Sequence, residues 1–449
     1  MLPISREALQ EVLDRFSITD VDHATIRQIL AVADTIQQQV GEPFLHLELG
    51  NPGLPPSQTG IEAEIEALRA GVANQYPNIT GIPQLKANGS RFIKAFMDID
   101  MPPRCIVPTV GSMQGCFTTM MMMKDRLPGR DTILFLDPGF PAQHHQAFVL
   151  GMRQASIDIY NCRGAALRDA LEEQLKDGRV TAMIYSTPNN PAWTNFTEEE
   201  LQIIGEAATR HDVVVMEDHA YMGMDFRSRY GRPGQAPFIP TVARYTDNYI
   251  LFLSASKIFS YAGQRIAIVC MSPQVYDRKY DFYRDFYGVP AYGDAFIFGV
   301  LYVASSGVCH SAQYGLAAML GAAADGQLDF VADCSAYGRR AARAKEIFAR
   351  GGFDLLYSTD GGDDTPISDG FFFTLRYGSL SGAELQKELM RYGISTISLK
   401  STGSLQQGVR VCVPLLVSDD DFERLDRRVT AFRQDHRVEE SAIVEPAVK

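Results

Sequence analysis

The chain has 449 residues, 46% of them hydrophobic and 21% charged, which is ordinary for a globular protein and long enough for two lobes. Its formal net charge of −12 argues against general binding of nucleic acids or anionic membranes, because phosphate groups attract basic surfaces. We therefore expect no nucleic-acid or membrane partner, although a small anionic ligand in a local cationic pocket stays compatible with this charge.

The seven cysteines are scattered and never form a Cys-x-x-Cys pair, so we expect reduced, mostly buried thiols and no metal site. The segment Met1–Glu7 does not resemble a signal peptide, because an acidic residue arrives before any apolar core. No apolar run approaches the length of a membrane helix. These features predict a cytoplasmic protein.

The first part of the chain predicts helices separated by a loop. Apolar residues recur at helical spacing through residues 5–40, and the same spacing returns at Ile61, Ile65 and Leu68. Between these segments, residues 50–57 are rich in Gly, Pro, Asn and Ser, which predicts a loop.

Strands and helices alternate from residue 132 onward. Uninterrupted apolar strands between helices indicate an α/β layer whose mostly parallel sheet is covered on both faces. A capping-box pattern, Thr197–Glu200, opens one of these helices. The predicted strands are Thr132–Leu136, Thr181–Tyr185, Val213–Met216, Ile250–Leu253 and Ile266–Val269.

The pattern changes near residue 307 to long helical stretches followed by two apolar segments, 370–375 and 409–413, which indicates a smaller α+β lobe. We therefore expect three regions. Residues 1–50 form a helical segment that packs with the small domain, residues 51–305 form a large α/β domain, and residues 306–449 form the small α+β domain.

One lysine has the surroundings of a reactive amine. Lys257 follows the apolar run Ile250–Leu253 and lies beside Ser254 and Ser256, and Arg265 comes eight positions later. A lysine held this way can form a Schiff base with an aldehyde. Serine hydroxyls and an arginine suit a phosphate dianion. An aldehyde and a phosphate on one small molecule describe pyridoxal phosphate.

A second anion-binding pattern precedes a helix at Gly111, Ser112 and Met113. Such a turn offers free backbone N–H groups at the positive end of the helix dipole. Taken alone it is more simply an ordinary helix start, and it gains weight only beside the serines and the arginine near Lys257.

Asp218 follows the predicted strand Val213–Met216, at the end of a strand where α/β proteins bind ligands. A carboxylate here can keep a pyridine nitrogen protonated and so make the ring a better electron sink. A plain surface acid is the alternative. Glu217 competes for the role, but side chains alternate along a strand, so one of the two faces the ring.

Two further strand ends carry candidate ligands. Asn190, in a Pro-Asn turn, and Tyr221 have donors for the ring oxygen, although such turns are common in any loop. Phe140 follows a third strand and can stack on the ring, or serve as an ordinary aromatic.

Arg410 is flanked by apolar residues on a predicted strand of the small lobe. A half-buried arginine needs an anionic partner, and a substrate α-carboxylate fits its two-pronged geometry. For an arginine considered alone, a structural salt bridge is the simpler reading.

The order of these motifs along the chain resembles that in the class I/II aminotransferase family of fold-type-I pyridoxal-phosphate enzymes. The resemblance covers roughly Leu47 to Pro414. The segments around Lys257 and Asp218 are specific in combination, whereas the Gly/Ser turn and Phe140 are not. The resemblance implies a large α/β domain with a smaller α+β domain, a pyridoxal phosphate cofactor, and a homodimer with shared active sites.

The resemblance also implies a role for each residue. Lys257 looks like the Schiff-base lysine and proton shuttle, and Asp218 like the partner of the pyridine nitrogen. Arg410 looks like the clamp for the α-carboxylate, and the loop at Gly50 and Asn51 like the segment that closes over substrate. The implied ring-oxygen ligands are Asn190 and Tyr221, and the implied phosphate ligands are Ser112, Met113 through its backbone, Ser254, Arg265 and, from the neighbouring subunit, Tyr76.

One departure from the family pattern concerns Trp193, the only tryptophan. The Asn-Pro turn reads Asn190-Pro191-Ala192-Trp193, where the family prefers Asn-Pro-Thr-Gly. A large ring therefore replaces a small residue and can reshape the pocket nearby.

The expected reaction is transamination between an L-amino acid and a 2-oxo acid through a Schiff base at Lys257. A β-lyase or decarboxylase of the same fold is the alternative, because the residues do not determine which substrate bond lies perpendicular to the ring. A non-catalytic transcription regulator is a third reading, but the residues before Leu47 are too few for an added DNA-binding domain and the chain is acidic.

Overall fold

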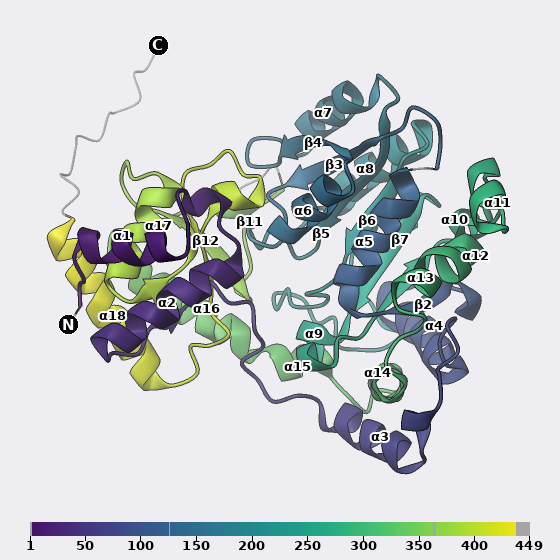
Figure 1. Ribbon diagram of the computed structural model, residues 1–449, viewed down its shortest axis with the longest axis horizontal. Helices are drawn as coiled ribbons and strands as arrows, with labels where there is room; N and C mark the ends of the chain where they lie inside the picture. The colour runs from purple at the N-terminus through teal and green to yellow at the C-terminus, as the bar shows by residue number, and fades with distance from the viewer. Residues whose placement is uncertain (1, 125, 362–364, 437–449) are drawn as a thin grey trace.

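The computed structural model describes residues 2–124, 126–361 and 365–436. Two lobes lie side by side, with the N-terminal helices and the C-terminal helix in one lobe and the main sheet in the other (Figure 1). The predicted α/β fold class is confirmed. The end of the small domain expected at residues 437–449 lies outside the described residues.

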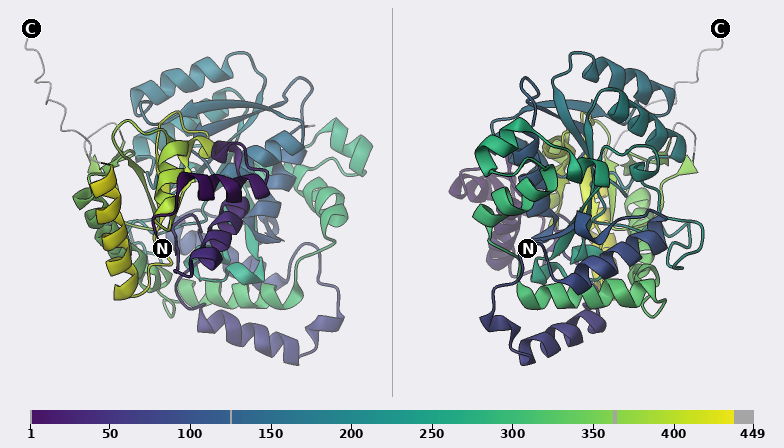
Figure 2. Two further views of the ribbon diagram at one scale, coloured as in Figure 1. Left: turned by 60° about the vertical axis from the view of Figure 1, so that its left-hand side comes forward. Right: turned by 90° about the vertical axis from the view of Figure 1, so that its right-hand side faces the viewer.

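The large lobe contains a seven-stranded sheet. Strands β3 to β7 run parallel and β8 runs antiparallel to both of its neighbours. In β3, β5, β6 and β7 every residue is buried, because both faces of the sheet are covered by helices (Figure 2). In spatial order the strands are β2 (Ile106–Thr109), β8 (Ala267–Met271), β7 (Tyr249–Ser254), β6 (Val214–Asp218), β5 (Val180–Ser186), β3 (Thr132–Asp137) and β4 (Arg153–Asp158).

The helices of the large lobe pack directly on this sheet or on one another. Helix α5 (Gly111–Lys124) contacts β2, β5, β7 and β8, and α8 (Glu198–Arg210) contacts β6. Helix α8 begins at the predicted capping box, in which Thr197 and Glu200 bond each other's backbone. Further helices of this lobe include α6 (Pro141–Val149), α7 (Ala165–Leu175), α9 (Ala255–Ile258), α11 (Asp281–Tyr287), η6 (Ala295–Leu301) and α13 (Tyr302–Ala304).

The placement of helix α14 (His310–Ala324) differs from the one that the expected domain boundary implies. It follows residue 305, where we placed the end of the large domain, but it packs against α3 (Gln58–Arg69) and α4 (Pro83–Met97). The large lobe therefore extends past the expected boundary. Ile65 and Leu68 of α3, expected on an apolar face, are exposed in this single chain.

The small lobe is built on a four-stranded antiparallel sheet. Its order is β14 (Ile397–Ser398), β15 (Val409–Cys412), β12 (Phe372–Arg376) and β9 (Asp354–Leu355). Helices α16 (Ala336–Arg350), α17 (Gly382–Arg391) and α18 (Asp419–Asp435) share its apolar core. The N-terminal helices α1 (Arg6–Arg15) and α2 (Ile26–Val40) pack together and reach Met390 of α17.

The two lobes meet along an apolar contact, which we call the seam. Phe371, Phe372 and Cys412 belong to the small lobe, yet they are buried in the same apolar cluster as the large-lobe strands. The predicted site residues of both lobes lie next to this seam. Within the described residues, no helix is long and apolar enough to cross a membrane.

Candidate active site

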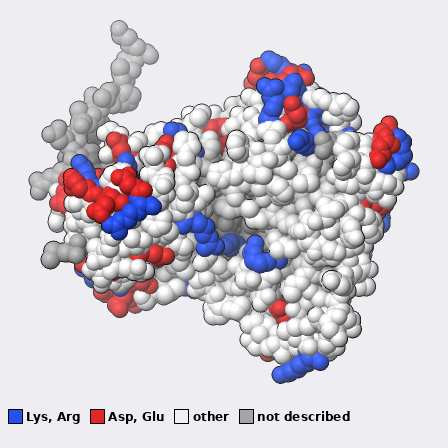
Figure 3. Space-filling view, in the orientation of Figure 1, with Lys and Arg blue, Asp and Glu red and all other residues white. Residues whose placement is uncertain are grey.

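The predicted site residues gather where the parallel strands end, at the seam with the small lobe. Asn190 follows β5, Asp218 ends β6, and Lys257 follows β7. Carboxyl ends of parallel strands open onto the ligand crevice of α/β proteins. Figure 3 shows a hollow between the lobes, close to α9, with Lys and Arg side chains on both sides of it. This local positive charge contrasts with the overall charge of −12.

Lys257 lies in the short helix α9, directly after β7. Ser254 caps this helix, since its hydroxyl accepts a hydrogen bond from the Ser256 N–H at 3.2 Å. The Lys257 amine donates to the carbonyl of Gly50 and lies 5.5 Å from the Phe371 ring centre. Burial lowers the pKa of Lys257 to about 8, so about a tenth of the amine is neutral at pH 7, far more than for an exposed lysine.

Asp218 and Glu217 point in different directions, as strand alternation predicts. Glu217 accepts hydrogen bonds from the Tyr185 hydroxyl at 2.8 Å and from the Thr241 hydroxyl at 2.5 Å, in a fully buried structural network. Asp218 instead accepts from the Gln143 amide at 2.9 Å. Burial raises the pKa of Asp218 to about 6, because its hydrogen bonds and the nearby His219 compensate only part of the cost of burying the charge.

Asn190, Tyr221 and Arg410 form one hydrogen-bonded group across the seam. Arg410 donates from Nη1 to Asn190 Oδ1 at 3.0 Å, and Asn190 Nδ2 lies 3.4 Å from the Tyr221 hydroxyl. All three side chains are buried. Burial raises the pKa of Tyr221, so its hydroxyl is a neutral donor.

Arg410 has no ion pair among the described residues, which argues against the structural salt bridge. Its Nη2 donates to the Glu48 carbonyl at 2.5 Å, and its Nε has no hydrogen-bond partner in this part of the chain. The side chain is 1% exposed. A buried guanidinium with an unused donor favours an anionic ligand.

Gly111 and Arg265 form a cradle at the start of α5. Ala267 of β8 pairs with Thr109 on one side and with Ser254 on the other, which brings the starts of α5 and α9 together. Gly111 has φ +66°, and a Cβ there would lie 2.5 Å from Nη2 of Arg265. Arg265 is exposed, and Ser112 and Met113 are half-buried. The Arg265 guanidinium thus packs directly against the start of α5, where a helix presents backbone N–H groups.

The remaining predicted residues lie at the edges of this arrangement. Phe140 is half-buried at the N-cap of α6. Gly50 contacts Lys257 through its carbonyl, whereas Asn51 is exposed. Tyr76 is 96% exposed, so within its own chain it takes no part in the site.

Two functional contributions were missed from the sequence. Gln143 donates a hydrogen bond to Asp218. Its position one helical turn after Phe140 is the sequence signal that could have indicated this contact. The aromatic pair Phe371 and Phe372 borders Lys257 and Arg410, but an apolar strand gives no sign of such a role.

Comparisons with known proteins identify the family of this chain. Residues 42–429 match the family model described as aminotransferase class I and II. The chain is 25% identical over 259 residues to glutamate-pyruvate aminotransferase AlaC of Escherichia coli, covering 57% of this chain and 60% of that protein. It is also 25% identical to human kynurenine–oxoglutarate transaminase 1 over 237 residues, covering 50% of this chain and 54% of that protein. The chain therefore matches a little over half the length of these relatives.

Solved structures show the same fold. Aspartate aminotransferase from Thermotoga maritima has a TM-score of 0.73 at 16% identity and covers 96% of this chain and 100% of its own. Aspartate aminotransferase from Thermus thermophilus with maleate has a TM-score of 0.73 at 17% identity, covering 91% of this chain and 96% of its own.

Proposed function

The chain belongs to the class I and II aminotransferase family, and on that premise we propose that it is an aminotransferase that moves an amino group between an amino acid and a 2-oxo acid. Members of this family depend on pyridoxal phosphate in general. That cofactor, when bound, supplies an aldehyde that condenses with amines and a ring that withdraws electrons from the substrate carbon.

The residues of the site fit this cofactor. Arg265 packs against Gly111 so closely that a Cβ there would displace its guanidinium, and a guanidinium beside a helix start suits a phosphate. Asp218 is a buried carboxyl that a protonated ring nitrogen would stabilise. Lys257 is a buried amine whose lowered pKa suits a nucleophile.

Lys257 and Arg410 have complementary tasks. The neutral Lys257 amine takes a proton from the α-carbon of the substrate and returns a proton at the next step. Arg410 binds the α-carboxylate with its two-pronged guanidinium and so orients the α-carbon toward that amine. Asp218 would hold its carboxylate charge for the protonated ring nitrogen of a bound cofactor.

One observation carries this proposal. Lys257 donates to the carbonyl of Gly50 and Arg410 donates to the carbonyl of Glu48, and these two carbonyls are two residues apart in the chain. A proton-accepting amine and a carboxylate-binding guanidinium are therefore held side by side, as an α-amino acid requires.

The test begins with the purified protein and added pyridoxal phosphate. We expect a yellow complex that borohydride fixes to Lys257, and a loss of its absorbance band when a productive amino donor is added. L-Alanine, L-glutamate, L-aspartate and L-kynurenine form the first donor panel. Lys257→Ala should abolish both signals, and a colourless wild-type protein, or release of ammonia without an oxo-acid acceptor, would contradict transamination.

The proposal includes a dimer that shares its active sites. Tyr76 is exposed on its own chain, which suits a residue that acts on a neighbouring subunit. The exposed aromatic side chains of α11, η6 and α13 (Phe282, Phe286, Phe298 and Tyr302) support a second copy as their cover. The free thiols support a reducing compartment such as the cytoplasm.

A further inference from the structure

Trp193 has an unusual backbone conformation for a large residue. Its φ is +63°, in the left-handed region that disfavours side chains with a Cβ. Two backbone hydrogen bonds of 2.9 Å hold the turn, from Trp193 N–H to Asn189 O and from Asn189 N–H to Thr194 O. A strained residue beside a functional site calls for an explanation in terms of what its side chain does.

The indole of Trp193 reaches out of the large lobe into the small lobe. It is 0% exposed, and its Nε1 donates to the Ser368 hydroxyl at 3.0 Å. Its ring centre lies 5.9 Å from that of Phe372. Gly370 leaves the space that the indole occupies, because any Cβ at that position would overlap the ring.

Trp193 is connected through this contact to the carboxylate-binding residues. The guanidinium of Arg410 lies 4.8 Å from the Phe372 ring centre, on the strand neighbouring β12. Asn190 stands three residues before Trp193 in the same turn. Tyr221 packs edge-on against both aromatic rings, 5.6 Å from Trp193 and 5.0 Å from Phe372. The group forms a closed ring of contacts.

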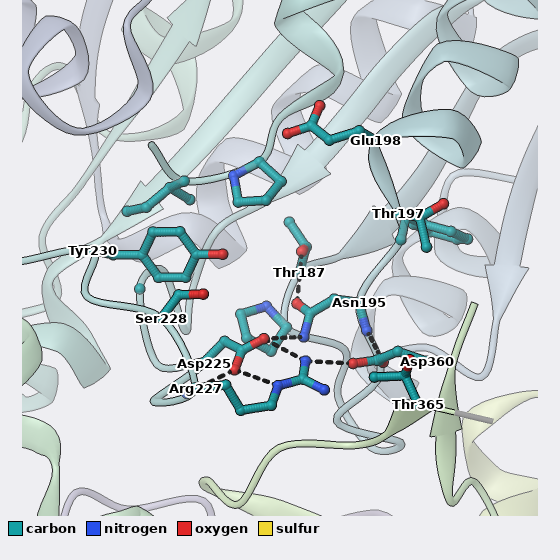
Figure 4. A pocket seen from close by; sticks show the side chains of 15 residues that line it. Thr187, Asn195, Thr197, Glu198, Asp225, Arg227, Ser228, Tyr230, Asp360 and Thr365 are labelled. Carbon is teal, nitrogen blue, oxygen red and sulfur yellow. Dashed lines mark hydrogen bonds and ion pairs between the residues drawn. The ribbon is translucent and has the colours of Figure 1, made fainter. Parts of the chain in front are cut away.

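A second contact fastens the same turn to the small lobe. The backbone N–H of Asn195 donates to Asp360 at 2.7 Å, and Arg227 bridges Asp225 and Asp360 (Figure 4). These residues line a cavity of about 340 Å³ beside the turn. The turn from Asn189 to Asn195 is thus tied to the small lobe by hydrogen bonds of Asn190, Trp193 and Asn195.

We propose that Trp193 is a positioning residue that locks the two lobes together at the seam, so that Arg410 and Asn190 form a rigid carboxylate receptor before substrate arrives. The inference rests on the proposed function. A preorganised receptor gives up less conformational entropy on binding, so loss of the lock weakens carboxylate binding more than it slows the reaction.

The test uses the holoprotein and two variants of the lock. Trp193→Gly suits the left-handed backbone and empties the seam, whereas Gly370→Ala keeps the tryptophan and forces it out of place. Propionate, succinate and glutarate, which are alanine, aspartate and glutamate without their amino groups, serve as probes in calorimetric titrations. For the acid that the wild type binds best, we expect Kd to rise at least tenfold in both variants, with kcat changed less than threefold.

Two further measurements separate positioning from packing. Trp193→Phe keeps an aromatic ring in the seam and should restore Kd to within threefold of the wild type. Since Trp193 is the only tryptophan, acrylamide quenching of its fluorescence should increase several-fold in Gly370→Ala. Phe432→Leu, in the apolar core of the small lobe, is a control that lowers the melting temperature without changing Kd.

The outcomes distinguish this inference from the proposed function. A Kd within twofold of the wild type in Trp193→Gly and Gly370→Ala, with turnover intact, overturns the role of Trp193 and leaves the aminotransferase assignment in place. A wild-type protein that forms no complex with pyridoxal phosphate overturns the proposed function, and the inference with it.

Discussion

Arg410 Nη1 lies 3.0 Å from Asn190 Oδ1, and this hydrogen bond joins a strand of the small lobe to a turn of the large lobe. Because Arg410 has no ion pair among the described residues, its charge is free for a ligand. The proposed carboxylate-binding site is therefore composed of residues of both lobes.

Arg410→Lys keeps the positive charge but loses the planar fork. We expect kcat/KM for the best donor to fall by about 10²-fold or more, because a buried two-pronged contact is lost, while pyridoxal phosphate binding stays intact. Steady-state kinetics and absorbance titration measure the two effects. Arg428→Lys is a matched control, since Arg428 is also buried and donates to the backbone carbonyls of Gly393 and Pro43, remote from the site. Equal losses in both variants would contradict a role in substrate binding.

The lowered pKa of Lys257 predicts a pH profile. Condensation with an aldehyde requires the neutral amine, so its rate should rise with pH through about 8 and then level off. Stopped-flow absorbance of the apoprotein mixed with pyridoxal phosphate, between pH 6.5 and 9.5, measures this rate, with Lys257→Ala as the blank. A rate that still climbs steeply at the upper end of this range would show an ordinary exposed lysine.

The raised pKa of Asp218 predicts that this carboxyl lowers the stability of the folded apoprotein at neutral pH, although activity requires it. Its folded-state pKa of about 6 lies above the ordinary value, so the folded apoprotein binds the proton more tightly than the unfolded chain. The contribution of this carboxyl to stability is therefore present at low pH and lost as pH rises through about 6, a difference of about 2–3 kcal/mol. At pH 7.5, apo Asp218→Asn should melt at a higher temperature than the wild type, although it loses activity.

The same comparison at pH 4 provides the control for Asp218. There the wild-type carboxyl is protonated in the folded state, so the two apoproteins should differ much less in melting temperature. A variant that is less stable than the wild type at pH 7.5 would show that the buried carboxylate is already compensated.

A side chain at position 111 should weaken the binding of the cofactor phosphate at the start of α5. Gly111→Ala places a Cβ 2.5 Å from the Arg265 guanidinium, so the Kd for pyridoxal phosphate should rise at least tenfold. Gly129→Ala is the matched control, because Gly129 also has a positive φ, +79°, but has no atom within 4 Å of the added Cβ. A similar change of Kd in both variants would assign the effect to backbone strain.

Shared sites predict complementation between two inactive variants. A dimer of Lys257→Ala with Tyr76→Phe contains one site with both native residues. After unfolding and refolding as an equal mixture, activity should return to about a quarter of the wild-type value, because half of the dimers are mixed and each has one working site. Activity no greater than the mean of the separate variants would exclude a contribution of Tyr76 across subunits.

The fold was predictable because its signals are local. Apolar strands such as Ile250–Leu253 and the capping box at Thr197 specify their own secondary structure, and Lys257 and Asp218 follow strands whose ends meet at one edge of the sheet. Contacts between the lobes were not predictable, because they join residues far apart in the chain. Nothing near Gly370 indicates that an indole fills its space, and the packing of α14 on α3 and α4 depends on the same kind of long-range contact.

The fit of Trp193 against Gly370 also constrains how this protein can change over evolution. A side chain acquired first at position 370 collides with the indole, and a glycine acquired first at position 193 leaves a void the size of that ring. Each single replacement lowers the stability of the protein, whereas the double replacement restores the packing. Positions 193 and 370 should therefore vary together among descendants of this chain. Homologues with glycine at position 193 should carry a larger residue at position 370.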